Sequence, residues 1–140
     1  MKLTSTVISL VALVSFASTV SGDPLPVIIN SAYDDSNRPL DTVSCNDHLS
    51  SLNNKFKTYG SLPTFPNVAG ISYVTGPSSW ACGTCWKVTF QSNSVYVLAI
   101  GHVKNGVELS TKTMNTLTNG MATKLAWAEV VQAENSMCGM

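Results

Sequence analysis

Cys82-Gly83-Thr84-Cys85-Trp86 is the stretch that decides the fold of this chain, because the other two cysteines, Cys45 and Cys138, lie far from it. Cysteines at this spacing suit a redox dithiol, half of a metal site, or the junction of two disulfide bonds. A zinc site made of four sulfurs normally comes as two Cys-x-x-Cys pairs, whereas here one pair is flanked by single cysteines. The choice depends on the compartment in which the protein folds.

Residues 1–22 have the pattern of a secretory signal peptide. Lys2 precedes an uncharged apolar run from Val7 to Phe16, which is shorter than the roughly 20 residues that cross a bilayer. Small residues before Asp23 predict cleavage there, and cleavage after Ala17 is the alternative. An uncleaved anchor is the other interpretation, and the length argues against it. We therefore expect a secreted protein with no membrane span.

The expected mature chain, residues 23–140, has room for one small domain. The full sequence has eight Lys and Arg and eight Asp and Glu, and removal of Lys2 leaves seven Lys and Arg against eight Asp and Glu, so the mature domain is nearly neutral. Nucleic-acid-binding proteins cluster their Lys and Arg residues, and the nearest feature here is the isolated pair Lys55 and Lys57. Nucleic acid is therefore not an expected partner.

In an oxidising secretory route, four cysteines indicate first a disulfide framework, for which three pairings exist. Cys82 and Cys85 pair with each other in a redox-active protein, or each reaches a distant partner. The residues alone leave the pairing open, although secretion favours structural disulfides over redox activity and over a metal site. We expect no metal and no cofactor.

Apolar periodicity predicts a β-rich domain. Strands are expected at residues 27–29, 68–74, 86–90, 95–100 and 125–132. A polar turn is expected at residues 91–94, and the segment 60–67, rich in Pro and Gly, should be a surface loop. Short strands without a βαβ rhythm predict a small β-barrel with helices packed outside it.

Two short helices are expected. Leu49, Leu52 and Phe56 recur at spacings of three and four, which places them on one face of a helix between residues 44 and 56. Its N-cap is expected to be Ser44 or Asn46. The second helix should begin after the N-cap Ser110 and stop at Asn119-Gly120.

With these segments in view, the sequence resembles the cerato-platanin family of small secreted proteins from filamentous fungi. The resemblance covers nearly the whole mature chain, and its most specific part is the segment from Cys82 to Val88 with Phe65-Pro66-Asn67 upstream. The other residues that carry it are Tyr33-Asp34, Gly60-Ser61-Leu62-Pro63, Val68-Ala69-Gly70, Asn119-Gly120 and Cys138.

This resemblance implies a mainly β, single-domain, six-stranded double-psi β-barrel with short flanking helices. It also implies disulfides between Cys45 and Cys82 and between Cys85 and Cys138. On that pairing the Cys-x-x-Cys segment is a structural junction, and no thiolate nucleophile remains.

The resemblance further implies a non-enzymatic protein of the extracellular space or fungal cell wall. Family members bind chitin oligomers, loosen polysaccharide assemblies weakly, self-associate at surfaces and elicit plant defences, which aids virulence. The implied partners are chitin or another cell-wall polysaccharide, a plant receptor, and further copies of the chain. An expansin-like loosening protein and a surface-active, self-assembling protein without a sugar site are the alternatives, and a thioredoxin-like oxidoreductase is the remaining class.

Catalysis is not expected. A glycosidase needs two carboxyl groups across the scissile bond, and most carboxylates here lie near predicted turns and helix starts, where they cap or are solvated. Family members usually carry an Asp at the end of the long central strand, where this chain has Gly101 followed by His102. Without a carboxylate at Gly101 we expect no proton transfer there, and weaker sugar contacts.

Sugar polymers bind shallow grooves through aromatic faces and a few convergent hydrogen bonds. Trp80 lies in a polar loop and should be exposed, while Trp86, beside a disulfide, should lie in the core. Asp34 is the best candidate for a groove carboxylate. The candidate carbohydrate-binding residues are Tyr33, Asp34, Arg38, Asn67, Trp80, Gly101 and His102.

Overall fold

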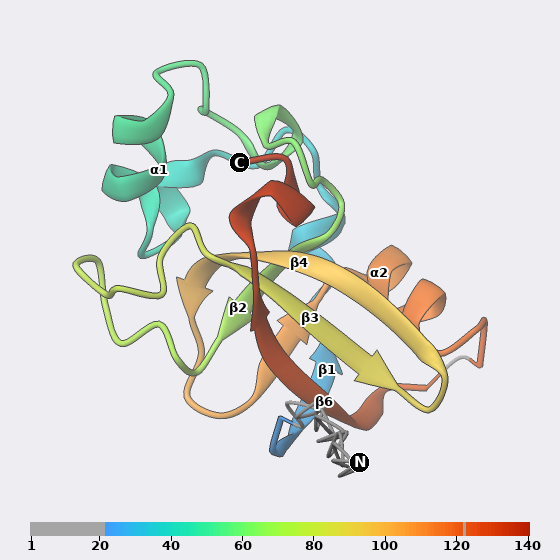
Figure 1. Ribbon diagram of the computed structural model, residues 1–140. Coiled ribbons are helices and arrows are strands. Elements are labelled where there is room, and N and C mark those ends of the chain that lie inside the picture. The colour runs from blue at the N-terminus through green and yellow to red at the C-terminus, as the bar shows by residue number, and fades with distance from the viewer. Residues whose placement is uncertain (1–21, 122) are drawn as a thin grey trace, which may run out of the picture.

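A computed structural model describes residues 22–121 and 123–140, which form a closed six-stranded β-barrel (Figure 1). The strands are β1 (Pro24–Ile29), β2 (Val68–Ile71), β3 (Cys85–Phe90), β4 (Asn93–His102), β5 (Val107–Leu109) and β6 (Leu125–Ala133). They follow one another round the barrel as β1-β5-β2-β4-β3-β6. Strand β1 runs parallel to β5 and β2 parallel to β4, and the other neighbours are antiparallel. The prediction of a mainly β barrel is therefore confirmed. The predicted signal peptide, up to residue 21, lies outside the described residues.

The strands form where side chains alternate between the barrel interior and its outer surface. In β6, Ala126, Ala128 and Val130 are buried, whereas the residues between them are exposed. This is the period of two that a half-buried strand requires. Strand β4 instead carries a continuous buried run at Val97–Gly101, because the helix α2 packs against it.

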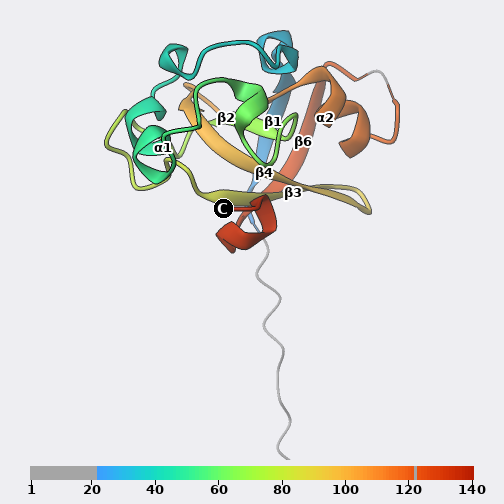
Figure 2. The same ribbon diagram turned by 90° about the horizontal axis from the view of Figure 1, so that it is seen from above.

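The two α-helices lie on opposite sides of the barrel, as Figure 2 shows. They are α1 (Asn46–Leu52) and α2 (Thr111–Leu117), and the short 3-10 turns are η1 (Ser31–Asp34), η2 (Leu40–Thr42), η3 (Tyr59–Ser61) and η4 (Asn135–Cys138). The expected N-cap of α2 is confirmed, since the Ser110 hydroxyl accepts a hydrogen bond from the Thr113 N–H at 3.0 Å.

The first helix is shorter than predicted. It ends at Leu52 because Asn53 adopts extended backbone, and its N-cap is Cys45, without a side-chain cap bond. Leu49 is fully buried as expected, but Leu52 is 53% exposed and Phe56 lies beyond the helix. The three residues therefore do not share one buried helical face.

Strand bounds also differ from the predicted ones. Strand β2 ends at Ile71, because the chain turns there and the Val74 N–H donates to the Ile71 carbonyl. The expected turn at residues 91–94 is only the pair Gln91-Ser92, since Asn93 already pairs with Phe90. Gln91 has a φ of 54°, which fits a tight two-residue hairpin.

Two disulfide bonds join Cys45 to Cys82 and Cys85 to Cys138. All four cysteines are buried, so each bond lies in the packed interior. The first bond ties the start of α1 to the loop before β3, and the second ties β3 to η4. This is the pairing that the family resemblance implied, and Cys82 and Cys85 are not joined to each other as in a redox-active pair.

Candidate functional site

A polar cavity of about 320 Å³ lies where β4 and β5 meet the segment around η1 and η2, and we call it the Tyr33 cavity. Four of the predicted sugar-binding residues line it, namely Tyr33, Arg38, Gly101 and His102. The complete lining is Asn30, Ala32, Tyr33, Arg38, Thr42, Val43, Ser44, Tyr59, Gly101, His102 and Glu108.

Tyr33 forms one wall of this cavity and stacks on Tyr59 with their ring centroids 5.7 Å apart. Burial of the ring raises the pKa of the Tyr33 hydroxyl far above its usual value. The neighbouring Glu108 carboxylate and Tyr59 raise this pKa further, and the Arg38 guanidinium opposes them. The Tyr33 hydroxyl is therefore neutral at physiological pH, so it can both donate and accept a hydrogen bond.

Glu108 and Arg38 bring opposite charges to the cavity. A carboxylate oxygen of Glu108 accepts a hydrogen bond from the Asn30 amide at 2.9 Å, which holds its side chain in place. The Nε of Arg38 is buried and has no hydrogen-bond partner among the described residues. A buried donor without a partner is costly, so an oxygen from a bound molecule would be stabilised there.

Gly101 leaves room in the wall for a methyl-sized group. A Cβ built on it would lie 3.6 Å from the Val43 Cβ and 3.7 Å from the Tyr33 hydroxyl, which is ordinary contact. Of the described residues that line the cavity, Glu108 is the one that carries a carboxylate. The acid pair that a glycosidase needs is therefore not assembled in this lining.

Asp34, the predicted groove carboxylate, lies at the first turn of α2 instead. Its two carboxylate oxygens accept hydrogen bonds from the Thr111 N–H at 3.0 Å and the Lys112 N–H at 3.2 Å. Asn67 also faces α2, since its Oδ1 accepts a hydrogen bond from the Thr113 hydroxyl at 2.8 Å. Both side chains hold the helix to the barrel and do not line the Tyr33 cavity.

Trp80 belongs to a different part of the surface. It is 64% exposed, as expected, and its ring lies 6.0 Å from that of Trp86. Trp86 is 5% exposed, stacks on Tyr73 and donates its indole N–H to the Thr84 hydroxyl at 2.7 Å. The expected core position of Trp86 is therefore confirmed, and the structure separates Trp80 from the other sugar-binding candidates.

Glu108 is the cavity residue that the sequence pattern does not reveal. It lies in the middle of the three-residue strand β5, whose parallel pairing with β1 brings it close to Asn30. The alternation Val107-Glu108-Leu109 was the available signal, and it is too short to predict a strand.

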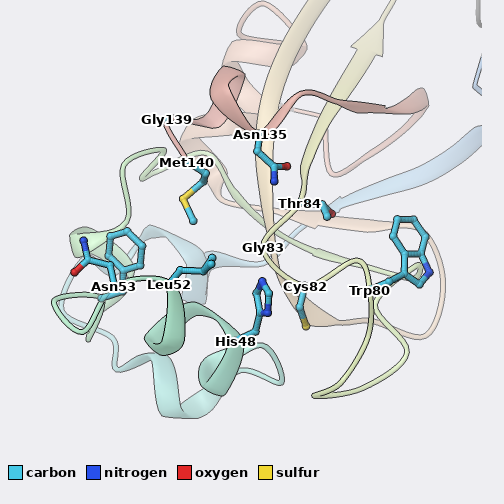
Figure 3. A pocket seen from close by; sticks show the side chains of 11 residues that line it. His48, Leu52, Asn53, Trp80, Cys82, Gly83, Thr84, Asn135, Gly139 and Met140 are labelled. Carbon is cyan, nitrogen blue, oxygen red and sulfur yellow. The ribbon is translucent and has the colours of Figure 1, made fainter.

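A second, larger pocket of about 640 Å³ lies between α1, the loop before β3 and the C-terminal segment, and we call it the Gly83 pocket (Figure 3). Trp80 lines this pocket and not the Tyr33 cavity. The complete lining is His48, Leu52, Asn53, Phe56, Trp80, Cys82, Gly83, Thr84, Asn135, Gly139 and Met140.

Residues 22–121 and 123–140 hold no group of three or more His, Cys, Asp or Glu side chains that could bind a metal ion. Within the same residues, no helix is long and apolar enough to cross a membrane.

The comparisons with known proteins agree with this fold and this size. A family model described as Cerato-platanin matches residues 25–140. The heat-stable 19 kDa antigen of Coccidioides posadasii is 33% identical over 140 residues, which cover 95% of this chain and 96% of that protein. The cerato-platanin of Ceratocystis fimbriata f. sp. platani is 31% identical over 101 residues, which cover 71% of this chain and 75% of that protein.

Solved structures of cerato-platanins are similar to this chain as well. The crystal structure of cerato-platanin 2 from M. perniciosa is similar with a TM-score of 0.76 and 32% identity, covering 84% of this chain and 99% of that one. The match of the family model extends over the barrel, both helices and all four cysteines. On the evidence of the barrel, the family model and these relatives, the chain belongs to the cerato-platanin family.

Proposed function

We propose that the protein is secreted, acts at cell walls without catalysing a reaction, and binds N-acetylglucosamine oligomers of chitin weakly in the Tyr33 cavity. The observation that carries this proposal is the convergence of polar groups of different kinds on one concave site beside Gly101. A phenol, a guanidinium, an imidazole and a carboxylate together supply the donors and acceptors that sugar hydroxyl and acetamido groups use.

The buried Nε of Arg38 and the neutral hydroxyl of Tyr33 support this proposal most directly. The Arg38 donor has no partner among the described residues, so a sugar oxygen would relieve its desolvation. The Tyr33 hydroxyl faces the space beside Gly101, where a Cβ would lie 3.7 Å away. The Tyr33 ring is packed against Tyr59 before any ligand arrives, which lowers the entropy cost of binding.

Weak affinity follows from the lack of an exposed ring at this site. Tyr33 and Tyr59 are 6% and 2% exposed, so their faces are covered by protein and cannot stack on a sugar. By the family resemblance, Gly101 also stands where an Asp is expected, so one strong acceptor would be missing. Binding then depends on hydrogen bonds alone, each of which contributes only about 0.5–1.5 kcal/mol.

Recognition by a host is the second part of the proposal. One solved relative is described as a fungal elicitor, and other relatives are described as antigens. These descriptions belong to those proteins, and they support the proposal that this chain elicits plant defences through a plant receptor. Infiltration of the purified protein into leaves, with the reduced and alkylated protein as control, tests whether the folded barrel is what the host detects.

The sugar site is tested by titrating the ¹⁵N-labelled protein with chitin oligomers. We expect saturable amide shifts at Tyr33, Gly101 and His102, and no release of new reducing ends. If the shifts are absent at millimolar oligomer, the sugar site is wrong. New reducing ends above the level of a heat-denatured control would contradict the non-catalytic part of the proposal.

A surface-active, self-associating protein is the second candidate, and one observation favours it. Ile28, Leu125 and Trp127 are 39%, 51% and 62% exposed on the outer face of β1 and β6. Ile28 pairs with Leu125 across the two strands, and Trp127 follows two residues along on the same face. Exposed apolar side chains gathered in this way mark association surfaces. If this candidate holds, Leu125→Lys should lower the apparent mass in sedimentation and reduce adsorption at the air–water interface.

A further inference from the structure

We propose that the Gly83 pocket is a second and independent ligand site, which takes an uncharged small molecule with an apolar body and a carbonyl group. Its lining shares no residue with that of the Tyr33 cavity. The volume of about 640 Å³ lies in the range of pockets that hold small organic molecules. This inference does not depend on sugar binding at the Tyr33 cavity.

Apolar side chains reach into the pocket from two sides. Figure 3 shows Leu52 of α1 and Met140 of the C-terminal segment pointing toward the same space beside Gly83. Leu52 is 53% exposed and Trp80, at one end of the pocket, is 64% exposed. A ligand would remove this apolar surface from water, and the soft Met140 side chain adapts readily to its shape.

Gly83 keeps the floor of the pocket open. Its φ of 71° suits glycine, and a Cβ there would lie 2.9 Å from the His48 Cδ2 and 3.5 Å from the Leu52 Cδ1. A Cβ there would therefore displace the His48 ring, whereas its contact with Leu52 would be an ordinary one.

Asn135 supplies a hydrogen-bond donor whose direction is fixed. Its Oδ1 accepts a hydrogen bond from the Cys85 backbone N–H at 3.3 Å, and a backbone N–H can only donate. The oxygen of the amide must therefore face Cys85, and the –NH₂ group faces the hollow above Gly83, as Figure 3 shows. No protein acceptor for this –NH₂ group is found in the described part of the chain.

Two of the side-chain acceptors around the pocket are already engaged. The Thr84 hydroxyl donates to the Ala81 carbonyl at 2.6 Å and accepts from the Trp86 indole N–H at 2.7 Å. The Oδ1 of Asn53 accepts from the Lys55 N–H at 2.9 Å. The Asn135 –NH₂ group, in contrast, is left as a donor for a ligand, so the ligand should supply an acceptor oxygen.

The charge of the pocket favours a neutral ligand. The residues that line it include no Asp, Glu, Lys or Arg side chain, and the one ionisable side chain among them that is not in a disulfide is that of His48. An ionised ligand would lose hydration on entry without an opposite charge to replace it. A ketone brings both the acceptor that the Asn135 –NH₂ group can use and an apolar body for Leu52 and Met140.

The probes for this site are two neutral ketones, 4-phenyl-2-butanone and 2-heptanone, added to the ¹⁵N-labelled protein. We expect saturable shifts at the Gly83 and Thr84 amides and at the Asn135 –NH₂ group. The matched control is 4-phenylbutan-2-amine, which keeps the aromatic skeleton and replaces the carbonyl by an ammonium. If neither ketone gives saturable shifts there, or if the amine binds as tightly, the proposal is overturned.

Variants separate the donor from the apolar wall. Asn135→Asp keeps an oxygen for the Cys85 N–H and removes the –NH₂ group, so it should weaken ketone binding at least about fivefold. Leu52→Ala should weaken ketone binding about fivefold or more. The matched control is Leu125→Ala, which should leave ketone binding unchanged, because Leu125 is 51% exposed on the outer barrel wall. Unchanged affinity in both pocket variants would overturn the proposal. Chitin titrations of the same variants should match the wild type, which keeps this result separate from the sugar site.

Discussion

The Cys85–Cys138 disulfide should contribute a large part of the stability of this domain. The two cysteines are 53 residues apart in the sequence, and the bond joins β3 to η4. Cross-linking a loop of this length removes chain entropy from the unfolded state that is worth about 4 kcal/mol at 25 °C. The double variant Cys85→Ala/Cys138→Ala should therefore lose about 4 kcal/mol, against a typical total of about 5–15 kcal/mol for a domain.

Urea denaturation monitored through the buried Trp86 measures this loss in the free energy of unfolding. The matched variant is Cys45→Ala/Cys82→Ala, which opens a bond with a sequence separation of 37. Because the entropy depends only on the logarithm of loop length, the two losses should agree to within about 1 kcal/mol. A loss below about 1 kcal/mol for either variant would refute the reasoning that the Cys-x-x-Cys segment is a stabilising junction.

Three further predictions concern the surroundings of the Tyr33 cavity. Asp34→Ala should lower the free energy of unfolding by about 1 kcal/mol, because two backbone N–H groups of α2 lose their acceptor, and Asp34→Asn should cost less. An unchanged melting temperature would show that this cap is unimportant. Because the pKa of Tyr33 is raised, the folded state keeps the phenolic proton to a higher pH than the unfolded state does. The free energy of unfolding should therefore fall as the pH rises above about 10, by up to about 1.4 kcal/mol per pH unit. Urea midpoints between pH 8 and 11 measure this fall, and Tyr33→Phe should reduce it. Gly70→Ala should destabilise the barrel by about 1–3 kcal/mol, since its Cβ would lie 2.6 Å from both the Tyr33 hydroxyl and a Val103 methyl. Gly101→Ala should be nearly neutral, because its Cβ would make only ordinary contacts. Equal melting temperatures for the two variants would contradict this geometry.

Most of the barrel could be predicted from local patterns. Strands β3 and β6 and the N-cap of α2 are visible because alternation and capping depend on neighbours in the sequence. Strand β5 could not be predicted, since three residues form a strand only when β1 and β2 supply partners on both sides. The helix α1 was overestimated because the spacing of Leu52 and Phe56 suggests a helix face that Asn53 interrupts.

The candidate site was less visible in the sequence, because its members come from separate segments. Gly101 and His102 end the long strand β4, and the family resemblance pointed to them. Asp34 has the right residue type, but its partners are the backbone N–H groups of a helix about 77 residues further along. Glu108 and the buried Nε of Arg38, unpaired among the described residues, could be recognised as site groups only from the closed barrel, which brings their segments together. Long-range pairing of this kind leaves no periodic signal.

Gly101 offers the most direct test of the proposed sugar site. Calorimetric titration with a chitin hexamer should compare the wild type, Gly101→Asp and the matched control Gly101→Ala. The space beside Gly101 accepts a small side chain, and a carboxylate there would lie near the Tyr33 hydroxyl. We predict that Gly101→Asp binds the oligomer at least about fivefold more tightly than the wild type, while Gly101→Ala does not. A folded Gly101→Asp variant whose affinity equals that of Gly101→Ala would contradict a sugar site in the Tyr33 cavity.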